Sequence, residues 1–193
     1  MNLINKNDII KVNLHILDDL LTLKQMFYKC CSLTSLSEIS SIKLTKIKNI
    51  DKLFLGCCLI NSLPDLSKLS TKNMTSMISV FSGCSSLVSL PDISKWKTDN
   101  LEDIRGLFSG CSSLKSFPDI SNWNTYNIKN MGFLFSKCSS LINLPNISKW
   151  KTNNLEDISG LFSGCSSLKS IPDISNWDTY NILQMDYFIN VQI

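Results

Sequence analysis

The chain has 193 residues, of which 44% are apolar and 18% charged, with a formal net charge of +3 and eight cysteines. This size and apolar share fit one folded domain or one short repeat array. The lysines are scattered and no basic run alternates with aromatic residues, which argues against a nucleic-acid partner. No apolar run approaches the ~18 residues of a membrane span, and the N-terminus lacks the pattern of a secretory signal. We therefore expect an intracellular protein, with a cell-surface location as the alternative.

The N-terminal segment has the features of a cap. In "KVNLHI" the apolar residues Val12, Leu14 and Ile16 alternate with polar ones, as in a half-buried strand. The following "LDDLLTLKQMF" has the apolar spacing of the later repeats. We predict that residues 1–25 are an N-terminal cap, made of a strand and the start of a helix, and that residues 26–193 are a repeat array that ends in a partial repeat.

Aromatic, cysteine and proline residues recur at a fixed interval of 27 residues, which predicts six repeats. We call the set of residues at one position in successive repeats a row. One row holds phenylalanines and another, three positions later, holds cysteines. The rows that we expect to form a buried structural ladder contain Phe54, Phe81, Phe108, Phe135, Phe162, Cys57, Cys84, Cys111, Cys138 and Cys165. All five prolines share a third row, and all four tryptophans share a fourth.

One unit can be interpreted as helix, corner and strand. In "NLEDIRGLFSGC" the apolar residues from Leu101 to Phe108 are spaced as on one face of a helix. Gly110 follows, at a position that favours a left-handed residue at a helix C-terminus. A short strand is predicted from Leu114 to Phe117, before a proline that cannot donate to a sheet.

Such a unit cannot bury its apolar face alone, so neighbouring units must stack. Strands pair at ~4.8 Å and helices pack at ~8–10 Å, so a stack of these units must curve. The predicted fold class is an α/β, leucine-rich-repeat-like curved solenoid, with short parallel strands inside and helices outside.

The recurring "FSGCSSL" raises the question of a reactive cysteine. A catalytic thiol needs a nearby base, and His15 is the only histidine. Zinc at the adjacent pairs Cys30–Cys31 and Cys57–Cys58, or a disulfide between Cys31 and Cys58, remains an alternative. The prediction is reduced, buried cysteine, with no catalytic residues, no metal site and no cofactor, in a protein that is not an enzyme.

One candidate binding surface combines two rows. The position after the strand leucine changes in chemistry from repeat to repeat, and an acidic row follows the prolines. The predicted surface residues are Val88, Lys115, Ile142, Lys169, Asp65, Asp92, Asp119 and Asp173. A solvated face with turn-forming aspartates is the alternative. The tryptophan row favours a packing ladder over a sugar-binding platform.

The C-terminal "ILQMDYFINVQI" begins another helix-like register without a polar cap. Truncation, or a partner covering that end, would account for this. We expect a monomer, with end-to-end contact possible at the uncapped C-terminus.

The segment "LFSGCSSLKSFPDISNWNTYNIKNM" resembles the BspA-type leucine-rich repeats and the related surface-protein repeats of mycoplasmas and other microbes. The likeness covers Met26–Phe188; the "LPDIS" stretch makes the present unit slightly longer. It implies a solenoid used for adhesion or protein interaction, often at a cell surface, and carries no catalytic residues. The hypothesis is a non-enzymatic protein-interaction module for an unidentified protein partner. The alternative is an extracellular or cell-surface adhesin fragment lacking its leader or anchor.

Overall fold

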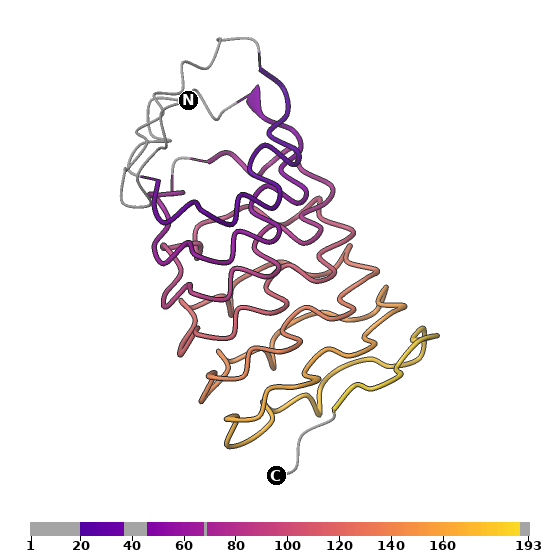
Figure 1. The fold of residues 1–193 in the computed structure, drawn as a ribbon. Coiled ribbons are helices and arrows are strands. Elements are labelled where there is room, and N and C mark those ends of the chain that lie inside the picture. Colours follow the sequence, from indigo (N-terminus) through magenta and orange to yellow (C-terminus); the bar gives the residue numbers. More distant parts are fainter. Residues whose placement is uncertain (1–19, 37–45, 68, 190–193) are drawn as a thin grey trace, which may run out of the picture.

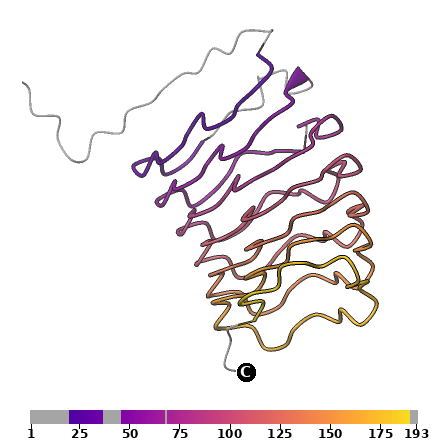
Figure 2. The same ribbon diagram turned by 90° about the vertical axis from the view of Figure 1, so that its right-hand side faces the viewer.

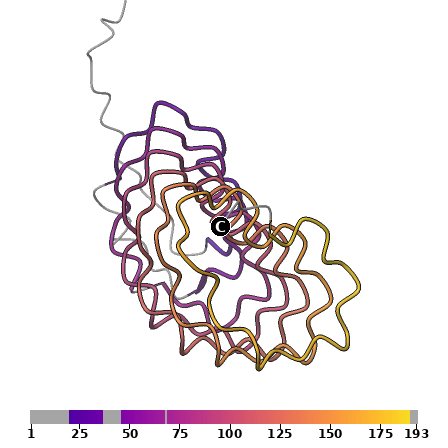
Figure 3. The ribbon, with the colours of Figure 1, turned by 90° about the horizontal axis from the view of Figure 1, so that it is seen from below.

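The computed structural model describes residues 20–36, 46–67 and 69–189. The chain winds into coils that stack one upon the next along the whole described length (Figures 1 and 2). Seen from below, the successive coils are offset from one another in a regular fan (Figure 3). Most of the predicted cap, residues 1–19, lies outside the described residues.

Neighbouring coils are connected by isolated parallel β-bridges. One row provides most of them: Thr22 to Asn49, Ser76 to Asp103, Asp103 to Asn130, Asn130 to Asp157, and Asp157 to Gln184. A further bridge joins Ser35 to Ser62. Each bridge joins residues 27 positions apart, so the period of the sequence is also the period of the coils.

The predicted helix from Leu101 to Gly110 is absent, and the described residues contain no α-helix and no strand longer than a bridge. The backbone N–H groups of this segment of the coil instead donate to the next coil. Met77 N–H donates to the Asp103 carbonyl at 2.9 Å, and Phe81 N–H donates to the Leu107 carbonyl at 3.0 Å. An α-helix would use these N–H groups for bonds to the residue four positions earlier. The two arrangements are therefore mutually exclusive.

Two rows of left-handed residues prevent a helix from forming. Gly106 has φ 61° and Gly110 has φ 73°, so a right-handed helix cannot pass through either position. The left-handed conformation predicted for Gly110 is thus present, although it does not end a helix. Residues with side chains adopt it too, at a cost of about 1–2 kcal/mol each. The other members of the two rows are Gln25, Lys52, Ser79, Phe133, Gly160 and Tyr187, and Lys29, Gly56, Gly83, Lys137 and Gly164.

Successive β-turns account for the helix-like spacing of apolar residues. Leu107 N–H donates to the Ile104 carbonyl at 3.2 Å, and Cys111 N–H donates to the Phe108 carbonyl at the same distance. Each turn spans three residue steps and returns a side chain to the interior. Ile104, Leu107, Phe108 and Cys111 are all fully buried. The prediction of an inward face was correct, whereas its helical geometry was wrong.

The predicted strand Leu114–Phe117 is also absent: no bridge occurs there. Phe117 instead packs edge-on between Phe108 and Phe135, with ring centroids 4.9 and 5.1 Å away. Because both elements are missing, the arrangement of inner strands and outer helices is wrong. The described chain is a solenoid whose coils are built from turns.

Stacked aromatic rings run through the core of the solenoid. The fully buried phenylalanines Phe81, Phe108 and Phe135 stack at centroid distances of 5.9 and 6.0 Å. The tryptophans form a second stack at 6.3–6.5 Å, and each indole N–H donates to a backbone carbonyl 30 residues earlier. Aromatic pairs contribute about 0.5–1.5 kcal/mol beyond their buried area. The tryptophan row is therefore a packing ladder, and its rings are not a free platform for a sugar.

Candidate functional site

The row of ladder cysteines binds each coil to the one before it. The Cys111 thiol donates to the Phe81 carbonyl at 3.2 Å, and Cys84, Cys138 and Cys165 make the same contact one or more coils away at 3.1–3.3 Å. Burial raises the pKa of Cys84 to about 12 and that of Cys165 to about 11. Burial likewise raises the pKa of Cys111 and Cys138. A nucleophilic cysteine needs a thiolate, so these thiols are packing groups and hydrogen-bond donors.

Polar side chains in two other rows serve the backbone in the same way. Thr125 Oγ1 donates to the Lys151 carbonyl at 2.9 Å, and Asn127 Nδ2 donates to the Asp99 carbonyl at 2.6 Å. The asparagines at equivalent positions, Asn100, Asn154 and Asn181, repeat this bond at 2.6–2.7 Å. Within the described residues every fully buried side-chain nitrogen or oxygen has a hydrogen-bond partner. The buried polar groups of the described coils are thus used in holding the stack together.

The structure brings four predicted surface residues together in one exposed row. Val88, Lys115, Ile142 and Lys169 occupy the same position in successive coils, and all four side chains are exposed. Lys169 N–H donates to the Ile142 carbonyl at 3.2 Å, so these two residues are direct neighbours across coils. We call Val88, Lys115, Ile142 and Lys169 the variable row. Its side chains are alternately apolar and basic.

The predicted acidic residues lie four positions further along each coil and are also exposed. Asp92 Oδ1 accepts hydrogen bonds from the Ser94 hydroxyl at 2.6 Å and from the Ser94 N–H at 2.9 Å. These bonds hold the pKa of Asp92 below its ordinary value. Asp65, Asp119 and Asp173 accept the same N–H bond from the serine two residues on, at 2.8–2.9 Å. Each aspartate therefore stabilises its own turn and leaves carboxylate surface open to solvent.

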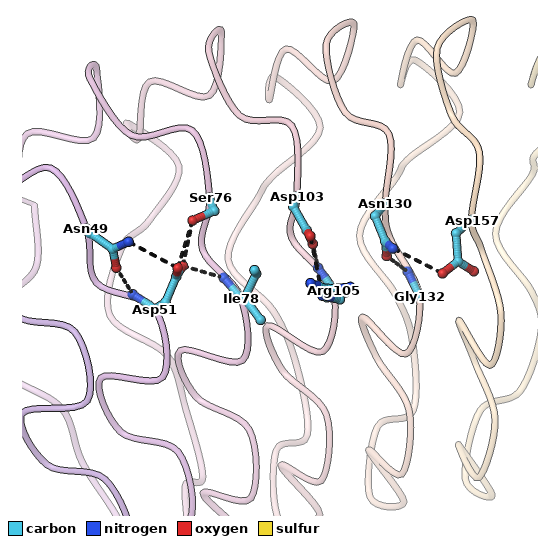
Figure 4. A network of polar contacts seen from close by, with 9 residues as sticks. All are labelled: Asn49, Asp51, Ser76, Ile78, Asp103, Arg105, Asn130, Gly132 and Asp157. Atoms are coloured by element: carbon cyan, nitrogen blue, oxygen red, sulfur yellow. Dashed lines mark hydrogen bonds and ion pairs between the residues drawn. The ribbon is translucent and has the colours of Figure 1, made fainter.

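A polar row at the β-bridges was not predicted (Figure 4). Asp51, which is nearly buried, accepts bonds from the Ser76 hydroxyl at 2.8 Å and from the Ile78 N–H at 2.9 Å. Three coils after Asp51, Asn130 Nδ2 donates to Asp157 Oδ2 at 3.1 Å. The sequence could have revealed this polar row, because small polar residues recur in it every 27 positions: Asn49, Ser76, Asp103, Asn130 and Asp157.

The bridge row is structural in its contacts. Half-buried Asp103 forms an ion pair with Arg105 at 3.3 Å. Burial raises the pKa of Asp103 in spite of that neighbour. On the adjacent exposed row, the Lys129 ammonium lies 2.9 Å from Glu102, and this hydrogen bond raises the pKa of Lys129. These carboxylates pair with amides, hydroxyls and cations of the same or the neighbouring coil.

Two shallow depressions lie on the surface of the described residues. A depression of about 150 Å³ lies over Lys129, Glu156 and Leu183, and one of about 200 Å³ lies beside Trp96 and Asn124. Small-molecule sites usually enclose ~300–1,000 Å³ and bury most of the ligand. These two depressions are smaller than that and open to solvent.

In the part of the chain that the structure describes, no three histidine, cysteine or acidic side chains are grouped closely enough to hold a metal ion. The alternative of zinc at Cys30, Cys31, Cys57 and Cys58 is thus without support, because these four do not form such a group. A search of the same residues found no helix of the length and apolarity that crossing a bilayer would require.

The stacked coils, paired through one backbone row and filled by repeated apolar side chains, define the class of repeat solenoids. The sequence matches the family described as "Mycoplasma protein of unknown function, DUF285" over residues 21–117 and 114–191. The chain belongs to this family. No functionally curated protein matches it.

One solved structure supports the solenoid class. The leucine-rich repeat protein of T. pallidum is 21% identical, with a TM-score of 0.51 over 79% of this chain and 63% of that protein. A leucine-rich repeat protein from Bacteroides ovatus is 17% identical over 90% of this chain and 65% of that protein, with a TM-score of 0.21. The chain thus spans less than two thirds of either protein. The first likeness shows a fold shared with leucine-rich repeat proteins.

Proposed function

We propose that the chain is a non-enzymatic protein-interaction scaffold of the leucine-rich-repeat type that binds an unidentified protein partner through the variable row. The proposal treats residues 26–193 as an array of six repeats capped by residues 1–25. It takes the protein to be a monomer, with the last described coil as a second contact surface.

One observation carries the proposal. Phenylalanine, cysteine, tryptophan and asparagine recur at fixed positions because each has a contact to make in the stack. The variable row is different: it holds valine, lysine, isoleucine and lysine at one exposed position. Packing does not determine the side chain there. Exposed residues on a regular solenoid form the extended binding surfaces that such proteins use.

The chemistry of the row suggests its partner. Two lysines on alternate coils, separated by apolar side chains, match an acidic protein surface that also presents apolar contacts. The exposed aspartates lie four positions further along each coil. Their negative charge would disfavour a partner with acidic groups facing them.

A charge-reversal pull-down tests this surface. The double variant Lys115→Glu/Lys169→Glu should lose partners that the parent chain captures, and high salt should weaken capture by the parent chain where binding is electrostatic. The matched control is Lys72→Glu/Lys151→Glu, which makes the same charge change at exposed lysines outside the row. If the row variant captured every partner as well as the control did, the variable row would not be the binding surface.

The second candidate is a cell-surface adhesin of the BspA type. It is supported by the resemblance of the repeats to BspA-type and mycoplasma surface-protein repeats. Protease treatment of intact cells that produce the natural protein distinguishes the two. Rapid loss of the protein would favour the adhesin, and full protection until lysis would favour an intracellular scaffold.

A further inference from the structure

The first two described coils differ from the later ones at one position. The residue after the ladder cysteine is Cys31 in the first coil and Cys58 in the second. In every later repeat it is serine, and each serine hydroxyl donates to the carbonyl of the equivalent residue in the preceding coil, at 3.2–3.4 Å. These serines are Ser85, Ser112, Ser139 and Ser166. The fold therefore accepts serine here, and two adjacent coils have thiols instead.

The backbone holds Cys31 and Cys58 side by side. Lys29 N–H donates to the Leu55 carbonyl at 2.7 Å on one side of the pair, and Asn61 N–H donates to the Thr34 carbonyl at 3.1 Å on the other. Paired parallel segments lie ~4.8 Å apart. A disulfide needs Cα atoms about 4.4–6.8 Å apart. The two coils are thus fixed at a spacing that a disulfide can bridge.

The thiols themselves also point to the shared edge of the two coils. The Cys31 thiol donates to the Gly56 carbonyl at 3.3 Å, and the Cys58 thiol lies 3.8 Å from the Cys31 carbonyl. A hydrogen bond with the Cys31 side chain is also the main reason that the pKa of Cys58 is raised. Both sulfur atoms therefore lie at the edge where the two coils meet.

Access separates this pair from the other cysteines. Cys31 is exposed and Cys58 is partly exposed. Cys57 is buried, and its thiol donates a hydrogen bond to the Phe27 carbonyl at 2.9 Å. Cys30 is exposed, but its counterpart in the next coil is that buried Cys57. Among the cysteines at equivalent positions of neighbouring coils, only Cys31 and Cys58 are both accessible to solvent.

We propose that Cys31 and Cys58 form a reversible disulfide that fastens the first described coil to the second, by exchange with a low-molecular-weight disulfide such as oxidised glutathione. The Cys31 thiolate attacks one glutathione sulfur, forms a mixed disulfide and releases one glutathione thiolate. The Cys58 thiolate then attacks the Cys31 sulfur and releases the second glutathione. Two protein thiols are oxidised, one glutathione disulfide is reduced to two thiols, and the two protons pass to the released thiolates.

The bond would fasten the first two described coils to each other. Coils of repeat proteins are held by their neighbours and can open locally. A covalent link at this position resists separation of the first coil from the second. Its formation depends on the redox state of the compartment and leaves the later coils unchanged.

The test uses the full chain equilibrated with mixtures of reduced and oxidised glutathione, then trapped with an alkylating reagent and analysed by mass spectrometry and peptide mapping. We expect one intramolecular disulfide in the oxidised chain, seen as a mass loss of about 2 Da and two fewer alkylated thiols. The first coil should also resist proteolysis more strongly in that form. Cys58→Ser should abolish the bond without unfolding the chain, because serine fills this position in the later repeats.

Cys30→Ser is the matched control and should retain the disulfide, while Cys31→Ser should lose it. This comparison is needed because Cys30 and Cys31 are adjacent in any digest. A bond that persisted in Cys58→Ser, a bond lost in Cys30→Ser, or eight alkylated thiols at every glutathione ratio would each overturn the proposal.

Discussion

Central coils and the last described coil contain the same side chains in different surroundings. Met131 is fully buried, whereas Met185, two coils later at the same position, is 58% exposed. Phe108 and Phe162 are fully buried, whereas Phe188 is only partly buried. The difference shows that a coil has no core of its own: its apolar groups are buried only by the coils above and below it. Stability in this chain is therefore a nearest-neighbour property.

The largest effect should come from removing a central ring. Phe108→Ala should lower the free energy of unfolding by about 3–5 kcal/mol, because it empties a fully buried site between two stacked rings. Phe188→Ala, the same change in the last described coil, should cost about 1 kcal/mol. Urea unfolding followed by tryptophan fluorescence measures both. Equal losses would contradict the nearest-neighbour account.

A substitution of one glycine sharpens the comparison between two otherwise similar coils. Gly160 has φ 59°, and a Cβ there would lie 2.5 Å from carbons of the Phe133 ring. Gly160→Ala should cost about 2–3 kcal/mol from strain and overpacking. Gly106 has nearly the same φ, but a Cβ there would meet the Ser79 hydroxyl oxygen at 3.0 Å and the Ser109 Cβ at an ordinary 3.9 Å.

Thermal unfolding of Gly106→Ala and of the double variant Phe133→Ala/Gly160→Ala supplies the controls. Gly106→Ala should be less destabilising than Gly160→Ala. Removing the ring in the double variant should bring back part of the loss caused by Gly160→Ala. The ring clash would be disproved if the two glycine variants were equally stable.

The sequence predicted the solenoid, the buried phenylalanine face and the tryptophan packing ladder, because each of these depends on which residues recur every 27 positions. It failed on the helix, since turns of three residue steps space Ile104 and Leu107 as a helix would. The left-handed φ of Ser79 and Phe133 could not be predicted, because serine and phenylalanine rarely adopt this conformation. The bridge row around Asp51 was missed because small polar residues resemble an ordinary loop.

Thiol variants extend the comparison at smaller scale. Cys111→Ala should cost about 1–2 kcal/mol, because it removes a buried side chain and its bond to the Phe81 carbonyl. Cys30→Ala, at an exposed position in the first described coil, should change stability by less than about 0.5 kcal/mol. Denaturation under reducing conditions measures both without interference from disulfides. Similar losses at the two positions would contradict the assignment of Cys111 as a buried thiol and Cys30 as an exposed one.

The smallest expected effect concerns the exposed aspartates and acid. Bonds from Ser121 hold the pKa of Asp119 below its ordinary value of 3.8 in the folded chain. The stabilisation is therefore complete above the pKa of the unfolded chain and is lost as pH falls through the lower folded pKa. Asp119→Asn should keep the turn, as Asn146 does in the next coil, and remove this part of the acid sensitivity. An unchanged pH profile of unfolding would exclude the bond as its source.

Residue-resolved amide hydrogen exchange tests the stacking of coils most directly. Phe133 and Phe135 N–H groups donate to the next coil at 2.7 and 3.1 Å. In the described part of the chain, the equivalent N–H of Tyr187 has no acceptor. The account predicts slow exchange at Phe133 and Phe135 and fast exchange at Tyr187. Equal protection at all three amides would contradict a fold in which each coil is held by its neighbours.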